Sequence, residues 1–199
     1  MSEGKILVQV FCIDKRFDSM AADFFKGVGI INDNVGLFDK YYMVTTAGGG
    51  LSPGYSSYCS EKYNTCCSCE SIESCDPENF DMKLLRDGII KNIDISLTLD
   101  EISGINLLNH QDCGAIKAYL ACSGYPETLG ENNELEIEIN TYLLKYAKTY
   151  MNSVYPDIFV AMLLMDINGT VAKLDFIHSS WNVIYRGVGD DPLGLWFDL

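Results

Sequence analysis

Long apolar runs alternate with amphipathic stretches along this chain, in an order typical of α/β proteins. Nearly continuous apolar runs predict strands that are buried on both faces, as in the middle of a parallel sheet. These runs cover residues 6–11, 41–45, 105–109 and 158–165. Asn168 and Gly169 form a strong hairpin signal after the last run, and they predict an antiparallel edge strand at residues 171–177.

Apolar residues at helical spacing separate the strand-like runs, and they predict helices that pack on the sheet. These helices cover residues 19–28, 82–97, 115–122 and 131–154. The predicted buried side of the last helix holds Leu135, Ile139, Tyr142, Leu143, Tyr146 and Tyr150. The chain therefore predicts an α/β fold: a mostly parallel sheet of about five strands, with an antiparallel edge strand and helices on both faces.

The regular pattern breaks between residues 52 and 80, where Ser, Tyr, Asn, Pro and five cysteines dominate. No apolar period persists there, so the segment is predicted to be a Cys-rich insertion loop. At 199 residues, the chain is expected to form one domain, residues 1–199, with this loop inside it.

The composition is that of a globular protein, since 48% of the residues are hydrophobic and 21% are charged. The net charge of −14 argues against nucleic acid and anionic membranes as partners. The chain shows no signal-peptide pattern and no apolar stretch as long as a membrane span. A cytoplasmic location is therefore expected, where thiols stay reduced, and the eight cysteines favour metal ligation or free thiols over disulfides.

Two short motifs, each directly after a predicted strand, carry most of the chemistry. Cys12 and Asp14 follow the first strand, and His110 and Cys113 follow the third. Loops at the carboxyl ends of neighbouring parallel strands converge on one crevice, so the two motifs are expected to meet. Cys12, His110 and Cys113 suit Zn²⁺ and leave a fourth position open, as in catalytic zinc sites. Water at that position ionises near neutral pH to a hydroxide that attacks an electrophilic carbon.

Asp14 and Arg16 lie two residues apart, next to a predicted zinc ligand. In an extended segment such residues point the same way, which permits a carboxylate–guanidinium pair. An ordinary ion pair is the alternative interpretation. Gly48 lies in the glycine-rich turn after the second strand, where the backbone can approach a bound group, so it is a candidate for substrate contact.

The two motifs, Cys12-x-Asp14-x-Arg16 and His110-x-x-Cys113-Gly, together resemble the signature of the β-class carbonic anhydrases. The resemblance runs from about residue 5 to about residue 174 and is interrupted by the Cys-rich insertion. It implies a zinc-dependent lyase that hydrates CO₂ reversibly to bicarbonate and a proton, with zinc-bound hydroxide as the nucleophile. It also implies a homodimer or higher homo-oligomer, because active sites of the family lie near the subunit interface.

The resemblance implies a double role for Asp14. Paired with Arg16, Asp14 would accept a hydrogen bond from the zinc-bound hydroxide and orient it toward CO₂. Released from Arg16, Asp14 would become the fourth zinc ligand and close the site. Protonation would bias this exchange, so the resemblance implies an activity that rises with pH.

The chain departs from the family at one turn, because it has Thr45-Thr46-Ala47-Gly48 where many members carry Arg-Asn-Ala-Gly. The motifs do not separate CO₂ from COS or CS₂, which related enzymes on this fold hydrolyse with the same zinc ligands. A non-catalytic protein is the alternative from another class. Its zinc would have four protein ligands, and its Cys-rich loop would bind a partner.

Cysteines of the insertion allow a second metal site. Cys66 and Cys69 are flanked by Cys59 and Cys75, so a structural zinc site of four cysteines is one interpretation. The spacing is not that of a standard zinc ribbon or finger, which leaves a loop of free thiols as the alternative. His178, the only other histidine, is interpreted as an ordinary strand-end residue, with a proton shuttle as the alternative.

Two other enzyme classes do not fit the motifs. A Cys-dependent phosphatase needs an Arg six residues after its nucleophilic Cys, and this chain has Asp18 at that distance from Cys12. A dinucleotide-binding enzyme needs the G-x-G-x-x-G spacing, which residues 47–50 lack.

Overall fold

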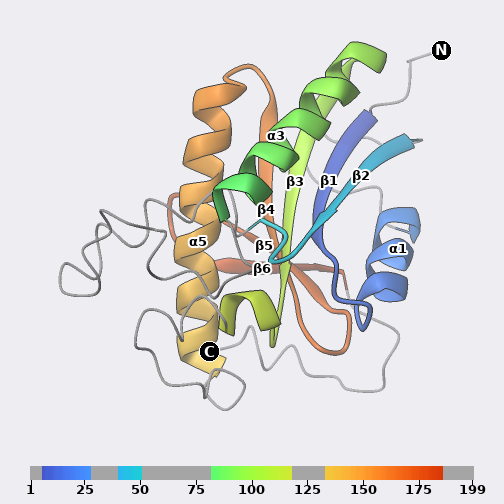
Figure 1. Ribbon diagram of the computed structural model, residues 1–199. Coiled ribbons are helices and arrows are strands. Elements are labelled where there is room, and N and C mark those ends of the chain that lie inside the picture. Colours follow the sequence, from blue (N-terminus) through green and yellow to red (C-terminus); the bar gives the residue numbers. More distant parts are fainter. Residues whose placement is uncertain (1–5, 28–39, 51–81, 118–132, 186–199) are drawn as a thin grey trace.

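The structure is a computed structural model that describes residues 6–27, 40–50, 82–117 and 133–185. Within these ranges, six strands form one sheet in the order β2-β1-β3-β4-β5-β6. The strands are β1 (Ile6–Cys12), β2 (Lys40–Thr46), β3 (Ile102–His110), β4 (Phe159–Met165), β5 (Val171–Leu174) and β6 (Trp181–Tyr185). Strands β1 to β4 are parallel, and β5 and β6 continue the sheet antiparallel at one edge (Figure 1). The predicted mostly parallel sheet with an antiparallel edge is confirmed.

Helices cover both faces of the sheet, as predicted. The helices α3 (Met82–Leu99) and α5 (Asn133–Val154) pack on one face, and α1 (Asp18–Gly27) packs on the other (Figure 1). Side chains alternate between the faces of a strand, so β1 directs Val10 toward α3 and α5 and Phe11 toward α1. The strands β1, β3 and β4 are therefore buried on both faces along most of their length, which explains their long apolar runs.

The strand order brings the two motif-bearing strands side by side. The chain continues from β1 to β2 on one side and from β3 to β4 on the other, so the connections diverge between β1 and β3. In open α/β sheets, a crevice for ligands forms at the carboxyl ends of the strands at such a point. The register pairs Phe11 with Leu108, so Cys12 and His110 lie at neighbouring strand ends.

The glycine-rich turn after β2 packs against the same strand ends. Gly49 has a φ of 50°, and a Cβ built on it would lie 2.7 Å from the carbonyl oxygen of Leu108. The same Cβ would lie 3.0 Å from the backbone nitrogen of Cys12. A residue without a side chain is required here, because the backbone of the turn lies directly against β1 and β3.

The antiparallel side of the sheet differs from the prediction in its length and its edge. The strand after the hairpin ends at Leu174 rather than at residue 177, and β6 pairs with it and forms the edge. The carboxylate of Asp175 accepts hydrogen bonds from the backbone N–H groups of Ile177 and His178. This turn, capped by the Asp175 side chain, ends β5 and leads into β6. The sheet of the described residues therefore has six strands, where about five were predicted.

The buried side of α5 also differs from the predicted one. Ile139 and Leu143 are buried as predicted, whereas Tyr142 is 38% exposed and Leu135, Tyr146 and Tyr150 are half-buried. The buried side also holds Glu136, Asn140, Leu144, Ala147 and Met151. Polar residues lie on this side because they have partners at the end of β3. The amide nitrogen of Asn109 donates to the amide oxygen of Asn140 at 3.0 Å.

Some predictions fall beyond the described ranges. The Cys-rich insertion at residues 52–80 lies outside them, so its place within a single domain stays a prediction. The helix predicted at residues 115–122 is described only to residue 117, and it is helical from residue 114. In the described part of the chain, no helix is long and apolar enough to cross a membrane.

Alanine should be tolerated at Gly88 and not at Gly49. Gly49→Ala adds a Cβ against the Leu108 carbonyl at a positive φ, so it should lower the free energy of unfolding by at least about 2 kcal/mol. Gly88→Ala in α3 adds a Cβ with nothing within 4 Å and improves helix propensity, so it should raise that free energy by up to about 1 kcal/mol. Urea denaturation followed by circular dichroism measures both changes. Equal effects at the two positions would contradict the tight packing of the turn.

Candidate metal centre

Cys12, His110 and Cys113 meet at the carboxyl ends of β1 and β3. All three are buried, and one ligand atom of each lies within 4.8 Å of the others. The two Sγ atoms are 3.9 Å apart. Two sulfurs bound to one tetrahedral zinc at about 2.3 Å would be about 3.8 Å apart, so this spacing fits a shared metal ion. The described residues therefore include a buried Cys–His–Cys group that could bind a metal.

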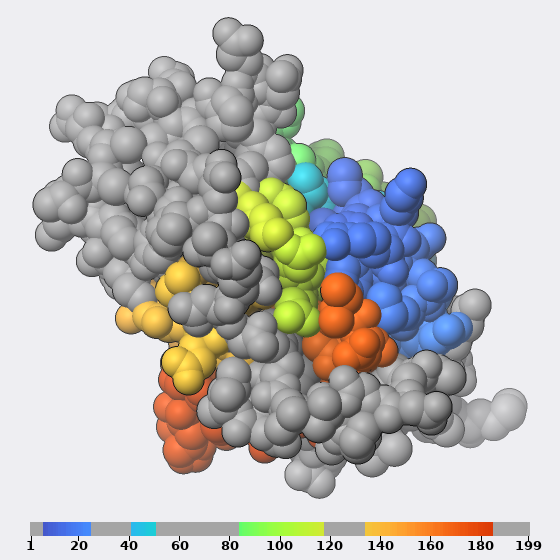
Figure 2. Space-filling view, turned by 90° about the horizontal axis from the view of Figure 1, so that it is seen from below, coloured from blue at the N-terminus to red at the C-terminus, as the bar shows by residue number. Residues whose placement is uncertain are grey.

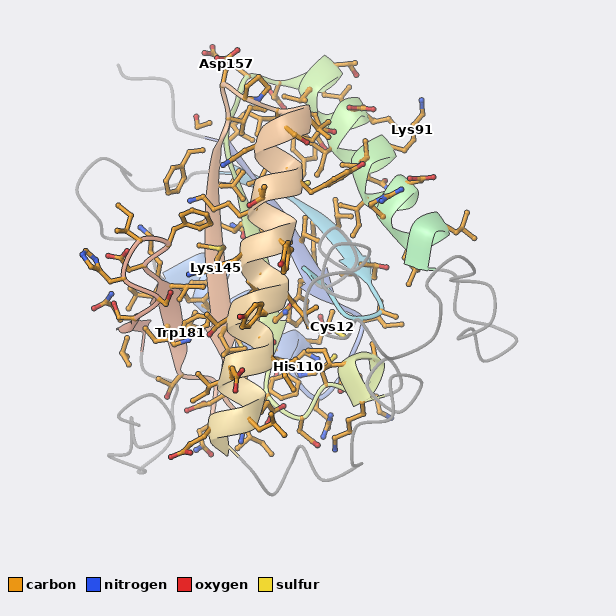
Figure 3. The ribbon with its side chains drawn as sticks, turned by 90° about the vertical axis from the view of Figure 1, so that its left-hand side faces the viewer. Cys12, Lys91, His110, Lys145, Asp157 and Trp181 are labelled. Atoms are coloured by element: carbon orange, nitrogen blue, oxygen red, sulfur yellow. The ribbon has the colours of Figure 1, made fainter. Side chains whose placement is uncertain are left out.

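The surrounding segments converge on the same end of the molecule. Viewed from that end, the segments of β1 and α1 (blue), the end of β3 with the residues after it (yellow-green) and the β4–β5 hairpin (orange) lie side by side (Figure 2). The backbone N–H of Gln111 donates to the carbonyl of Met165 at 2.8 Å, which joins the end of β3 to the end of β4. Cys12 and His110 lie toward one end of α5, and Asp157 lies at the other (Figure 3).

The ring of His110 is oriented for metal ligation. Its Nδ1 lies 2.8 Å from the carbonyl oxygen of Gln111 and donates to it, which leaves the lone pair on Nε2. Nε2 is buried and has no hydrogen-bond partner among the described residues. The ring of Phe17 lies against His110 with 4.1 Å between ring centroids. A buried nitrogen without a partner is unfavourable, and a bound metal ion would satisfy it.

The two thiols influence each other's ionisation. The hydrogen bond with Cys113 lowers the pKa of Cys12 below its ordinary value. The same contact and burial raise the pKa of Cys113. One proton therefore leaves the pair readily and the second is retained, because two thiolates at this distance repel each other. A dication between the sulfurs would stabilise both thiolates, so the donor set fits a divalent metal.

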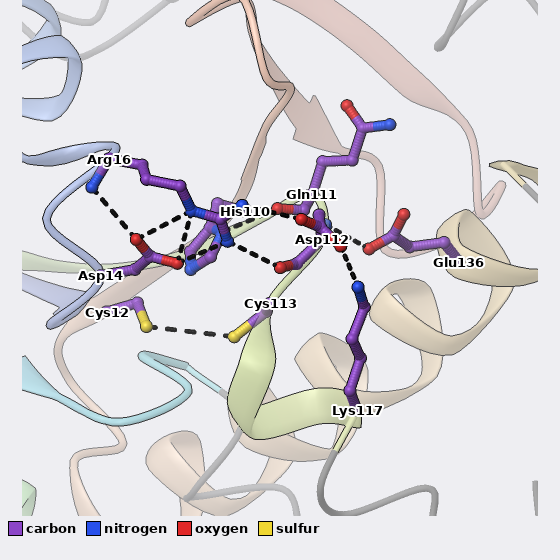
Figure 4. Close-up of polar contacts among 9 residues, drawn as sticks. All are labelled: Cys12, Asp14, Arg16, His110, Gln111, Asp112, Cys113, Lys117 and Glu136. Atoms are coloured by element: carbon purple, nitrogen blue, oxygen red, sulfur yellow. Dashed lines mark hydrogen bonds and ion pairs between the residues drawn. The ribbon is translucent and has the colours of Figure 1, made fainter. Parts of the chain in front are cut away.

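Arg16 holds the carboxylate of Asp14 in a bidentate ion pair (Figure 4). The shortest contact joins Nη2 to Oδ2 at 2.6 Å, and Nε lies 3.1 Å from both oxygens. The backbone N–H groups of Arg16 and Phe17 donate to the side chain and carbonyl of Asp14. The two side chains thus meet through a tight turn and not through the extended segment that the spacing predicted. Arg16 lowers the pKa of Asp14 to about 2, so this carboxyl is ionised at neutral pH.

Arg16 also connects the two motifs. Its Nη1 donates to the carboxylate of Asp112 at 2.7 Å, and its Nη2 donates to the carbonyl of Asp112 at 2.9 Å. Lys117 contacts the other carboxylate oxygen of Asp112. One guanidinium therefore ties the loop after Cys12 to the loop between His110 and Cys113 (Figure 4).

Glu136 of α5 supports the loop between the two later ligands, and sequence reasoning missed it. Its side chain is buried, and Oε1 accepts a hydrogen bond from the backbone N–H of Asp112 at 2.5 Å. Asp112 has a φ of 57°, which side-chain-bearing residues adopt uncommonly. Burial raises the pKa of Glu136 to about 7. The sequence pattern did not reveal this role, because an acidic residue in the first turn of a helix is already explained by the helix dipole. The sequence signal that could have indicated its burial is its helical spacing to Asn140 and Leu143, which places the three residues on one side of α5.

The remaining candidate residues lie apart from this group or outside the described ranges. Gly48 is buried with a φ of 80°, and its contact with a substrate stays a prediction. His178 lies in the turn between β5 and β6, with its side chain 73% exposed and Nδ1 3.0 Å from the Asp175 carboxylate. The second metal site stays a prediction, because its residues lie outside the described ranges: Cys59, Cys66, Cys69 and Cys75.

Comparisons with known proteins give structural likeness only. No family model matches the chain, and no curated protein matches it. Among solved structures, the chain is similar to the β-carbonic anhydrase CcaA, with 13% identity, a TM-score of 0.44 and coverage of 90% of this chain and 84% of that chain. It is also similar to the β-carbonic anhydrase CafA of the fungal pathogen Aspergillus fumigatus, with 12% identity and a TM-score of 0.41. That match covers 87% of this chain and 76% of the other. The assignment of a function therefore rests on the site.

The Cys–His–Cys group should hold one zinc ion. Cys113→Ser removes a thiolate, so the protein should lose about one equivalent of zinc against a competing chelator, with affinity reduced at least about tenfold. Elemental analysis after dialysis measures the content. Cys75→Ser is the matched control for the predicted second site. Unchanged zinc content in Cys113→Ser would contradict the site described here, and unchanged content in Cys75→Ser would contradict a site in the insertion.

The hydrogen bond from Asp112 to Glu136 should contribute to metal affinity. Glu136→Ala leaves a buried N–H without an acceptor, which costs about 1–3 kcal/mol of stability and should weaken zinc binding about tenfold. Glu136→Gln retains an accepting oxygen and should keep most of the affinity. Glu134→Ala, an exposed residue on the same helix, should change neither quantity. Chelator competition and urea denaturation measure them. Equal losses in the Ala and Gln variants would show that the charge of Glu136 matters and not the hydrogen bond.

Proposed function

We propose that this protein is a zinc-dependent carbonic anhydrase that converts CO₂ and water to bicarbonate and a proton. The observation that carries the proposal is the Nε2 of His110, which has no hydrogen-bond partner among the described residues and lies beside two sulfurs spaced for one tetrahedral ion. The resemblance of the two motifs to the β-class carbonic anhydrases supports it, because that signature includes the ligands and the adjacent Asp14–Arg16 pair. The proposal extends to a homodimer or higher homo-oligomer and to a cytoplasmic location.

Cys12, His110 and Cys113 would hold the metal. Thiolate and imidazole ligands favour zinc over magnesium or calcium, which prefer oxygen ligands. Three protein ligands leave one position of a tetrahedral ion for water or substrate. Zinc bound in this way lowers the pKa of its water to about 7, so it supplies a nucleophile near neutral pH.

Asp14 and Arg16 would orient the reacting groups. The ionised carboxylate of Asp14 is an acceptor only, and it lies two residues from the ligand Cys12. The bonds of Arg16 to both Asp14 and Asp112 keep this carboxylate in place. Asp14 can leave Arg16 only by giving up a bidentate ion pair, which supports a state in which the fourth metal position is available to substrate. A structural zinc closed by four protein ligands is correspondingly less favoured.

Stopped-flow measurement of CO₂ hydration tests this proposal. Zinc-replete protein should turn over CO₂ at a rate that rises between about pH 7 and about pH 9. Asp14→Ala should retain zinc and lose about a hundredfold in kcat, because the orienting acceptor is gone. Asp157→Ala, an exposed carboxylate at the far end of α5, should leave kcat unchanged (Figure 3).

Two outcomes would contradict the proposal in different ways. Zinc-replete protein that hydrates no CO₂ in this pH range is not a carbonic anhydrase, and COS and CS₂ then become the substrates to assay. Loss of zinc and of stability in Asp14→Ala would identify Asp14 as a fourth ligand of a structural site.

A further inference from the structure

A cavity lies along the amino-terminal half of β4, away from the candidate metal centre. Its volume is about 340 Å³, within the range of small-molecule sites, and its lining includes Phe159, Lys148, Lys173 and Phe176. Phe159 begins β4, whereas Met165 at the other end of the strand contacts Gln111 beside His110. The cavity and the candidate metal centre therefore lie toward opposite ends of the same strand.

Lysines from different elements gather around the aromatic rings of this cavity. The Nζ atoms of Lys148 from α5 and Lys173 from β5 lie 5.7 Å and 5.5 Å from the ring centroid of Phe159. Lys148 and Lys145 lie 5.4 Å and 5.5 Å from the ring centroid of Phe176. These distances are within cation–π range. The chain has twice as many acidic as basic residues, 28 against 14, so a positively charged cluster stands out from its overall charge.

Lys148 and Lys173 both line the cavity. Neither Lys148 nor Lys173 forms an ion pair within the described ranges. Asp175 also lines the cavity, but its carboxylate is engaged by the turn residues Ile177 and His178. Burial, and then the like charge of Lys173, lowers the pKa of Lys148. Both ammonium groups lie beside the same Phe159 ring, so their like charges repel each other, and an anion that contacts both would offset that repulsion.

The backbone of β4 adds polar groups at the same place. β3 pairs with β4 from Phe159 to Met165, whereas β5 pairs with it only at residues 163–165. Residues 160–162 line the cavity, and no other strand of the described chain lies along this edge. Alternate residues of a strand direct their N–H and C=O groups to a given edge, so this part of β4 directs main-chain polar groups toward the cavity.

We propose that this cavity binds a small organic anion, with its charged group between Lys148 and Lys173 and an apolar, preferably aromatic, body against Phe159 and Phe176. The two rings are 48% and 43% exposed, so a ligand would cover apolar surface that water now contacts. Lysine is a compact point charge that accepts carboxylate and phosphate alike, so the rings select the ligand class. The proposal uses no residue of the metal centre and is independent of the proposed activity.

Benzoate is the probe that tests the site, because it joins a carboxylate to one aromatic ring. Benzamide is the matched control without charge, and inorganic phosphate is the control without a ring. Isothermal titration calorimetry on the full-length, zinc-loaded protein should give one benzoate site with Kd of about 1 mM or tighter. Benzamide and phosphate should bind at least about tenfold more weakly, since each lacks one half of the recognition.

Variants locate the bound probe. Lys148→Gln combined with Lys173→Gln should weaken benzoate binding at least about tenfold, because both charges are gone. Lys91→Gln, an exposed lysine on α3 at the opposite flank of the molecule, should bind benzoate as the unchanged protein does (Figure 3). Cys113→Ser should also bind it unchanged, since the metal centre takes no part. Should the double variant fail to fold, each single lysine variant is expected to lose affinity several-fold.

Several results would overturn the proposal. Unchanged benzoate affinity in the lysine variants would remove the lysines from the site, and a loss in Cys113→Ser would place benzoate at the metal centre. Phosphate that binds as tightly as benzoate would remove the role of the rings. Absence of benzoate binding up to about 10 mM would leave the lysines as residues that shield the open edge of β4 from other strands.

Discussion

Cys12 and His110 end two strands that pair in parallel, with Phe11 opposite Leu108, one residue before Cys12 and two residues before His110. A shift of this register by one residue would turn one ligand to the other face of the sheet. The register is held by apolar side chains on both faces and by the backbone of Gly49, which lies against β1 and β3. The apolar core of the sheet therefore determines the geometry of a polar site at its edge, and the third ligand needs only the short loop from His110 to Cys113.

A layer of charged and polar side chains then holds the ligand loops in place. Arg16 bonds to Asp14 in one loop and to Asp112 in the other, and Glu136 accepts a bond from the backbone of Asp112. The Arg16 contacts lie at the surface, whereas Glu136 is buried, and together they connect the segments after β1 and β3 to α5. The bond between Asn109 and Asn140 extends this connection along α5. Glu136 therefore stabilises a defined backbone conformation between His110 and Cys113, at a position of α5 where an apolar residue could otherwise pack.

Much of the fold follows from local sequence patterns. The apolar runs predicted β1, β3 and β4, helical spacing predicted α1, α3 and α5, and Asn168-Gly169 predicted the hairpin. The pattern failed at β6, because a short edge strand of mostly half-buried residues carries a weaker signal than a buried strand. It also failed on the buried side of α5, because Glu136 and Asn140 read as solvent-facing until their partners at the end of β3 are known.

The sequence by itself determined the types and the local spacing of the candidate ligands. Cys113 follows His110 by three residues, and an imidazole or thiol has the same ligand chemistry wherever the chain places it. Only the tertiary structure decided that the Sγ atoms of Cys12 and Cys113 lie 3.9 Å apart across 101 residues. It also decided that Arg16 contacts Asp112 and that the buried Glu136 accepts a hydrogen bond from the backbone of Asp112. It also decided that lysines of α5 and β5 share one cavity. Short-range pattern is encoded in neighbouring residues, whereas these contacts depend on how whole strands and helices pack.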